Sequence, residues 1–357
     1  MRRGENIYKC RDGRWEGRYI ASRDENGKAC YRSVYAPTYM EVRDKLRKCS
    51  QELKNENTSL FENIGENWLS GVKLRCKLST YNKYFSTYHN HLLPEFSGLR
   101  ISELNSKRIE GFISGKTDLS DKTRTDILSM LKQIVKFAEH SGFYVDNTIS
   151  DLSVRRSVNE IRVLTVQEQI RLENYLLSCD SLITTGIYIT LYTGLRIGEL
   201  CALKRSDIDL DYGMIHISGT MQRLRINTTA TRTQVMITEP KSKCSIRDIP
   251  IPKAILNVCR MYYYNIPEHC FILTGNETYI EPRLLNYHFK KCTKACDLEN
   301  IRFHTLRHTF ATRCIERGVD VKSLSEILGH YDVNVTLNRY VHPSMELKRK
   351  NIEKLCR

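Results

Sequence analysis

The stretch YTGLRIGELCAL, residues 192–203, connects two predicted helices and carries a basic residue, Arg196, at the junction. An apolar run ends at Gly194, a residue type that commonly terminates helices, and apolar periodicity resumes just after Arg196. A cation at the positive N-terminus of a helix is unfavourable on its own, so a bound anion would resolve the conflict. Pairing of Arg196 with Glu199, three residues further on, is the alternative that this stretch leaves open.

Two further stretches carry groups suited to phosphate. HTLRH, residues 304–308, places His304 and Arg307 three residues apart on one face of a predicted helix. Arginine offers a planar pair of donors that matches two phosphate oxygens, and histidine adds a donor or a proton acceptor. In LGH, His330 follows a predicted glycine C-cap, and Tyr340 comes ten residues later. Spacing alone does not bring these groups together.

A lysine pair lies where two predicted strands meet. PKSKCSIRDIP, residues 240–250, carries Lys241 and Lys243 in this turn. A lysine on a hairpin can enter a neighbouring site and release a proton there, whereas arginine holds its proton too tightly. A solvated surface lysine is the usual alternative.

Taken together, two arginines, two histidines, a lysine and a tyrosine in this order resemble one family, the tyrosine recombinases, which are the integrases of phages and transposons. TGLRIGEL looks like the family's first arginine motif, the lysine turn like its lysine hairpin, and HTLRH like its His-x-x-Arg box. LGH and the following NRY resemble its last histidine and its nucleophile. The resemblance covers the whole chain. The catalytic residues that it implies are Arg196, Lys241, His304, Arg307, His330 and Tyr340.

The resemblance also implies the chemistry. Tyr340 would attack a scissile DNA phosphate, forming a 3'-phosphotyrosyl bond and releasing a 5'-hydroxyl, while Arg196 and Arg307 stabilise the charge on the non-bridging oxygens. The remaining implied roles are general base or donor for His304, hydrogen bonding to the phosphate for His330, and proton donation to the leaving 5'-oxygen for Lys241.

No cofactor and no metal are expected. The covalent bond conserves the energy of the phosphodiester, and the sequence has neither a P-loop nor an acidic metal-binding cluster. His288, Cys292 and Cys296 recur at every fourth position of a predicted helix, with His304 nearby. A zinc site favours tighter, paired ligand spacing, so we expect ordinary half-buried residues.

The first 55 residues are predicted to form a small sheet followed by a helix. RWEGRYIAS and KACYRSVYA mix aromatic, β-branched and polar residues around the turn signal DENGK. Residues 1–50 hold 13 Lys and Arg against 7 Asp and Glu, which predicts a separate anion-binding module, with a solvated sheet face as the alternative. By resemblance, residues 1–55 are the arm-site DNA-binding domain of a large integrase.

Two more domains follow a polar segment, QELKNENTS, that is expected to be a linker or a frayed helix end. Residues 60–152 show helical periodicity and resemble the family's helical, SAM-like core-binding domain. Residues 160–357 correspond to the catalytic domain, with helices around a three-stranded β insertion made by GMIHISG, TQVMITEP and SIRDIPI. The predicted fold class is therefore multidomain and mainly α.

Composition agrees with a nucleic-acid partner. The chain has 357 residues with a net charge of +15 and a pI near 9.2, an excess that usually meets a polyanion. It has no apolar run of about 18 residues and no signal peptide, so we expect a bacterial cytoplasmic, nucleoid-associated protein without a membrane partner. The 13 scattered cysteines are expected to be reduced thiols.

The expected partners follow from the resemblance: double-stranded DNA at core and arm sites, and a homotetramer assembled on paired sites. An excisionase and a host DNA-bending protein are left open. The arm-like module favours a recombinase that integrates and excises a phage or conjugative transposon over a chromosome-dimer resolvase. Two alternatives remain. A DNA-binding protein that has lost strand transfer conflicts with the six filled positions, and a type IB topoisomerase conflicts with the arm-like domain and the short chain.

Overall fold

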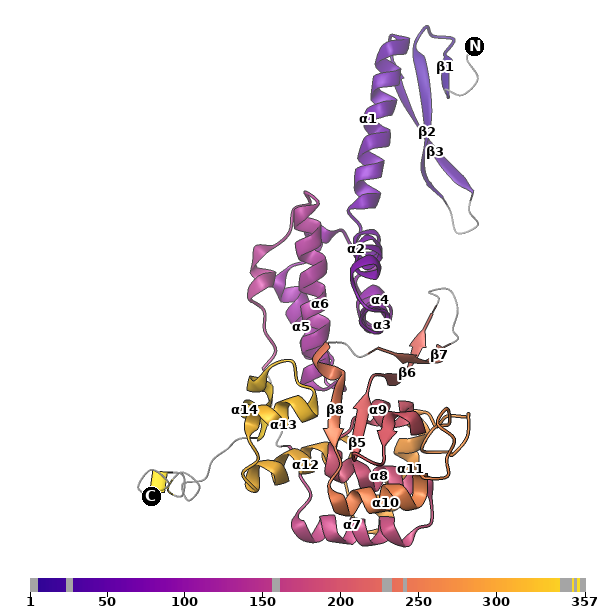
Figure 1. Ribbon diagram of the computed structural model, residues 1–357. Coiled ribbons are helices and arrows are strands. Elements are labelled where there is room, and N and C mark those ends of the chain that lie inside the picture. The colour runs from indigo at the N-terminus through magenta and orange to yellow at the C-terminus, as the bar shows by residue number, and fades with distance from the viewer. Residues whose placement is uncertain are drawn as a thin grey trace. The chain divides into compact units, whose positions relative to one another are not determined.

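The computed structural model of the protein describes residues 6–23, 28–155, 161–226, 233–239, 243–340, 349 and 352–353 (Figure 1). The chain forms two compact units, Met1–Val158 and Asn159–Arg357. Over the described residues, no helix is both long enough and apolar enough to cross a membrane. The predicted mainly helical fold with small antiparallel sheets is confirmed.

The first unit begins with an antiparallel sheet covered by a helix. Its strands are arranged in the order β1-β2-β3, and helix α1 follows them. A Cβ at Gly17 would come within 2.6 Å of side chains of α1, so glycine allows the helix to approach the sheet closely. The bounds are β1 Ile7–Lys9, β2 Trp15–Arg23, β3 Ala29–Ala36 and α1 Tyr39–Thr58. The segment expected to be a linker or frayed end is the last part of α1.

The rest of this unit is helical and has its own apolar core. Phe61 stacks on Tyr88 and packs against Phe96, and all three are fully buried. A Cβ at Gly65 would collide with the Tyr88 ring, so this glycine makes room for the ring. The helices are α2 Phe61–Arg75, α3 Leu78–Thr87, α4 Leu93–Phe96, α5 Ser106–Gly115 and α6 Asp121–His140, with a short π-helix at Tyr88–Leu92.

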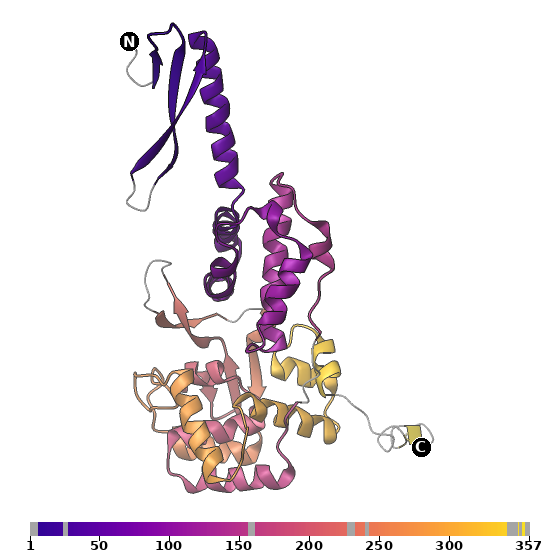
Figure 2. The same ribbon diagram turned by 180° about the vertical axis from the view of Figure 1, so that it is seen from behind.

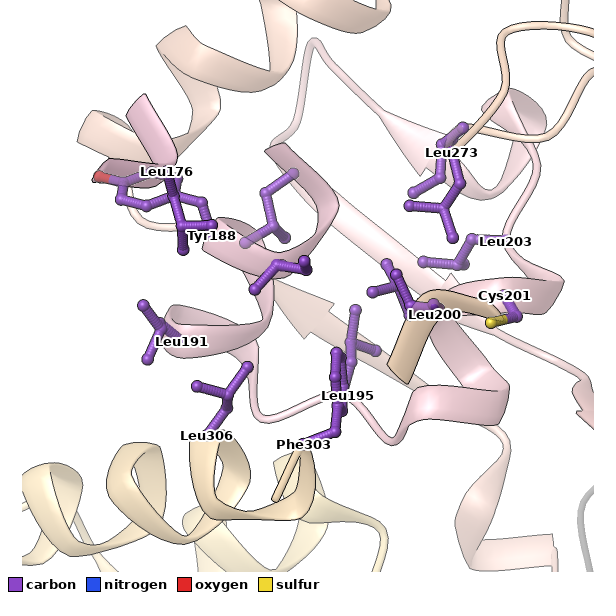
Figure 3. Packing of buried hydrophobic residues seen from close by; sticks show 14 of the residues in the cluster. Leu176, Tyr188, Leu191, Leu195, Leu200, Cys201, Leu203, Leu273, Phe303 and Leu306 are labelled. Carbon is purple, nitrogen blue, oxygen red and sulfur yellow. The ribbon is translucent and has the colours of Figure 1, made fainter. Parts of the chain in front are cut away.

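The second unit is built around α8, an apolar helix that is buried along most of its length. Leu306 of α12 lies beside Leu191 of α8, and Phe303 lies beside Leu195 (Figure 3). This packing brings the start of α12 to the end of α8. The helices are α7 Val166–Ser178, α8 Leu182–Thr193, α9 Ile197–Ala202, α10 Lys253–Tyr263, α11 Pro282–Ala295, α12 His304–Glu316, α13 Val321–Leu328 and α14 Val333–Tyr340.

The β insertion differs from the expectation in its pairing. The three predicted strands form, but the middle one, β7, pairs with β6 in a separate two-stranded ribbon (Figure 2). The other two join β4 in a sheet of order β4-β5-β8. The polar sequence of β6, TMQRLR, hides its strand character. The strands are β4 Ile208–Asp209, β5 Met214–Ile217, β6 Thr220–Arg225, β7 Thr233–Thr238 and β8 Arg247–Pro250.

Candidate active site

Gly194 and Arg196 form the junction between α8 and α9. Gly194 caps α8 with a φ of 65°, a left-handed conformation that suits glycine. Arg196 is the N-cap of α9; its Nη1 lies 2.7 Å from Glu199 Oε1, and its backbone N–H donates to Oε2 at 2.9 Å. Its Nη2 donates to the carbonyl of Gly329 at 3.3 Å. The pairing with Glu199 therefore holds Arg196 beside the loop that carries His330.

Glu199 also binds a second arginine, Arg247 of β8. Its two carboxylate oxygens accept hydrogen bonds from Nη1 and Nη2 of Arg247 at 3.1 and 3.0 Å, and both side chains are buried. Arg247 Nε also donates to the carbonyl of Ile327 at 2.6 Å, which ties β8 to the end of α13. Burial opposes ionisation of Glu199, but the hydrogen bond and charge of Arg247, with the charge of Arg196, lower its pKa to about 2.

Arg307 lies in the middle of this group, with only 1% of its surface exposed. It donates to the carbonyls of Gly194 at 2.9 Å and Leu328 at 2.6 Å, and its Nη2 is 3.0 Å from His330 Nε2. None of the hydrogen-bond partners found in the described residues is a carboxylate. Burial, and then the charge of Arg196, lower the pKa of Arg307 to about 9. An anion would remove the cost of this buried cation.

His330 is held between Arg307 and α14. Because Arg307 donates to Nε2, the ring proton sits on Nδ1, which lies 2.7 Å from Thr336 Oγ1 and donates to it. Burial, and then the charges of Arg307 and Arg196, lower the pKa of His330 to about 4, so the ring is neutral at pH 7. Thr336 is fully buried, and this hydrogen bond therefore links His330 to the helix that ends at Tyr340.

Tyr340 is the last residue of α14 and is 7% exposed. Its hydroxyl lies 2.8 Å from Nδ1 of His308, whose ring meets that of His304 edge to face at a centroid distance of 4.5 Å. Burial raises the pKa of Tyr340, against the charges of Arg307 and Arg339, which lower it. His304 keeps an open face to solvent, yet desolvation by the surrounding protein and then the charge of Arg307 lower its pKa to about 4.

The structure thus brings together five of the six residues expected from the sequence. Hydrogen bonds connect Arg196, Arg307 and His330 through the backbone around them, and His308 and its ring contacts connect Tyr340 with His304. Lys241, the sixth, lies outside the described residues. Three guanidinium groups, one carboxylate and neutral imidazoles give the site an excess positive charge, which suits a phosphate.

Comparison with known proteins identifies the family. The model described as "Phage integrase family" matches residues 162–346, just over half of the 357 residues. The chain belongs to this family. A second match, to the phage integrase N-terminal SAM-like domain, covers residues 60–117. The enzyme is therefore a tyrosine-type site-specific recombinase, as the sequence predicts.

Relatives of this recombinase align over most of its length. A tyrosine recombinase XerC-like protein of Caldanaerobacter subterraneus subsp. tengcongensis is 27% identical over 93% of each chain. A Tn1549 transposon integrase, solved with a circular intermediate DNA, has a TM-score of 0.69 at 21% identity and covers 82% of this chain and 99% of its own. A λ integrase tetramer bound to a Holliday junction has a TM-score of 0.60 at 18% identity and covers 94% and 95%.

Sequence reasoning missed two residues of the recombinase site. His308 is part of the quoted motif HTLRH, but helical spacing draws attention to His304 and Arg307 and gives no sign of a partner 32 residues away. Arg247 did leave a signal. In β8 it shares the inward face with Ile249, and an arginine at a buried strand position requires an acidic or carbonyl partner.

Proposed function

We propose that this recombinase cuts and rejoins double-stranded DNA through a covalent bond between Tyr340 and a 3'-phosphate. The observation that carries the proposal is the buried guanidinium of Arg307, which is bonded to carbonyl oxygens and to the neutral ring of His330 and lies in the same group as Arg196. Such an arrangement suits the developing negative charge of a phosphoryl transition state.

In the proposed step, the Tyr340 oxygen bonds to phosphorus as the bond from phosphorus to the 5'-oxygen breaks. Lys241 gives a proton to the departing oxygen, which leaves as a hydroxyl. Arg196 and Arg307 hold the non-bridging oxygens. The remaining proposed roles are phosphate hydrogen bonding for His330 and a donor or base for His304. The reverse attack by a 5'-hydroxyl from the partner strand rejoins the DNA, so the bond energy is conserved and no cofactor is consumed.

We extend the proposal to the domains. Residues 1–55 would bind arm-site DNA, residues 60–152 core-site DNA, and residues 160–357 would carry the catalytic groups. The match of residues 60–117 to the family's SAM-like domain supports the second assignment. For the first, basic side chains lie over aromatic rings of the small sheet: Arg14 over the exposed ring of Tyr35, and Lys9 over the half-buried ring of Trp15.

The proposed partners are core and arm DNA and further copies of the chain in a tetramer, as in the λ integrase assembly. A chain that holds two separated DNA sites at once requires the DNA between them to bend. Because duplex DNA is stiff over about 150 base pairs, a host DNA-bending protein and, for excision, an excisionase would supply that bend. We propose that the protein acts in the bacterial cytoplasm, at the nucleoid, because its proposed substrate is DNA.

The proposal is tested by incubating the purified chain, with a host DNA-bending protein and an excisionase added, with two DNA molecules that carry the junctions flanking its gene. Integration and excision of a phage or conjugative transposon predict new recombinant junctions without ATP or metal. Relaxation of supercoils without exchange between the two molecules would instead indicate a topoisomerase. Binding without any cleavage would indicate a DNA-binding protein that has lost strand transfer.

A further inference from the structure

His308 contacts the proposed nucleophile, Tyr340, through a hydrogen bond. Its Nδ1 lies 2.8 Å from the Tyr340 hydroxyl oxygen, within normal hydrogen-bond distance. The two rings are 5.6 Å apart at an interplanar angle of 51°, so the bond lies at the ring edges rather than between stacked faces. His308 follows Arg307 on α12, and this placement sets its imidazole between the phosphate-binding group and the end of α14.

The protonation states of the two groups define what this hydrogen bond can do. Burial raises the pKa of the Tyr340 hydroxyl, which therefore keeps its proton at pH 7. Burial, and then the positive charge of nearby groups, lower the pKa of His308 to about 4, so its ring is neutral. In the neutral tautomer that carries its proton on Nε2, Nδ1 has a lone pair that accepts the hydrogen bond of the Tyr340 hydroxyl. The contact is thus aligned for proton transfer.

We infer that His308 is a further catalytic residue, the group that takes the hydroxyl proton of Tyr340 as this oxygen attacks the DNA phosphate. The inference rests on the proposed function. As the bond between oxygen and phosphorus forms, the proton moves to Nδ1 and gives an imidazolium ion, while the 5'-oxygen leaves with a proton from Lys241. When a 5'-hydroxyl attacks in the rejoining step, His308 returns its proton to the departing Tyr340 oxygen.

Charged neighbours of His308 decide when it can hold this proton. His304 and Arg307 face it from α12, and Arg339 faces it from α14. In the absence of DNA these groups disfavour a positive charge on the ring. A phosphate bound between the arginines adds negative charge to the same site, and more accumulates in the transition state. His308 therefore becomes a stronger base when substrate is bound, which links proton removal to the presence of DNA.

His304 is the competing candidate for this role. Its ring contacts that of His308 edge to face, whereas the Tyr340 hydroxyl is bonded to Nδ1 of His308. Arg339 also hydrogen-bonds to Tyr340, but a guanidinium only donates and cannot take the proton. His304 also has a face open to solvent, which suits contact with DNA. The geometry therefore assigns the proton of Tyr340 to His308 and leaves His304 free to meet the phosphate.

The test uses the full chain and a nicked suicide DNA substrate that traps the covalent complex. His308→Ala removes the acceptor, and His308→Asn keeps an oxygen near the position of Nδ1 that accepts a hydrogen bond but no proton. We expect both to slow single-turnover cleavage by about 10² to 10⁴ fold, the usual loss for a missing acid or base, with unchanged DNA affinity. The matched control is His269→Asn, an exposed histidine paired with Glu277, which should cleave at the wild-type rate.

A second measurement separates proton transfer from positioning. Replacing Tyr340 with 3,5-difluorotyrosine gives a more acidic phenol, which needs less help to lose its proton. With 3,5-difluorotyrosine at position 340, we expect the cleavage rates of the chain with His308 and of His308→Asn to differ by no more than about tenfold, because the missing base then matters less. A difference that the fluorinated residue leaves unchanged would overturn the inference, as would wild-type cleavage by both His308 variants.

Failure of the inference is distinguishable from failure of the proposed function. Tyr340→Phe removes the nucleophile that the proposed function requires. If this variant still forms the covalent complex, the proposed function is wrong. If it forms none while the His308 variants cleave normally, the nucleophile stands and His308 is not its base.

Discussion

Replacing Glu199 with glutamine should destabilise the second unit by about 3 kcal/mol at pH 7. The carboxylate is 3% exposed and binds both Arg196 and Arg247. One pKa unit corresponds to about 1.4 kcal/mol, so lowering the pKa of Glu199 from 4.5 to about 2 stabilises the fold by about 3 kcal/mol. This agrees with the ~3 to 5 kcal/mol that removing one partner of a buried ion pair usually costs.

Urea unfolding followed by far-ultraviolet circular dichroism measures this loss. Tryptophan fluorescence identifies the unfolding of the first unit, because Trp15 and Trp68 both lie there, and this transition should not change in Glu199→Gln. The control is Glu316→Gln, whose pair with Arg313 is exposed on the carboxylate side and should contribute under about 1 kcal/mol.

The pH dependence sharpens the test. A lowered folded pKa means that the stabilisation is present above pH 4.5 and is lost as the pH falls toward 2. The difference in the free energy of unfolding between Glu199→Gln and the unsubstituted chain should therefore shrink to about half by pH 3. A difference below about 1 kcal/mol at pH 7, or one that does not change with pH, would refute the reasoning.

Three more outcomes are expected. Lys241→Ala should cleave ordinary DNA about 10² to 10⁴ times more slowly but a 5'-bridging phosphorothiolate at nearly the wild-type rate, while Lys243→Ala cleaves both normally. Deleting residues 1–55 should reduce the salt dependence of binding to DNA that carries arm sites, as measured by titration. Because burial lowers the pKa of His308 and His330 to about 4, stability should fall as the pH drops from 6.5 to 4, seen as a lower melting temperature.

Much of the fold could be predicted because its helices carry strong apolar periodicity. The amphipathic pattern of α6 and the apolar run of α8 locate these helices closely. The end of α1 was harder. Its last residues lack an apolar stripe, yet they contain no glycine or proline, so nothing stops the helix before Thr58. The pairing of β6 with β7 was missed because strand pattern gives no information on which strands become neighbours.

The candidate site also has a part that local sequence predicts and a part that depends on tertiary packing. Arg196, His304, Arg307, His330 and Tyr340 could be named from motifs, since side-chain chemistry and local spacing are visible in a sequence. The contacts that complete the site join residues far apart. Glu199 meets Arg247 across 48 positions, and His308 meets Tyr340 across 32. Such pairs form only when α9, β8, α12 and α14 pack together, and a single sequence does not predict this packing.

The covalent bond to DNA tests the central claim most directly. The chain is trapped on a nicked suicide substrate and digested with trypsin, and the modified peptide is identified by mass spectrometry. Cleavage after Arg339 and Lys348 releases YVHPSMELK, in which Tyr340 is the one tyrosine. We predict a nucleotide on this peptide and none in Tyr340→Phe. A nucleotide on the preceding peptide, which carries the exposed Tyr331, or an adduct that survives in Tyr340→Phe, would contradict the account.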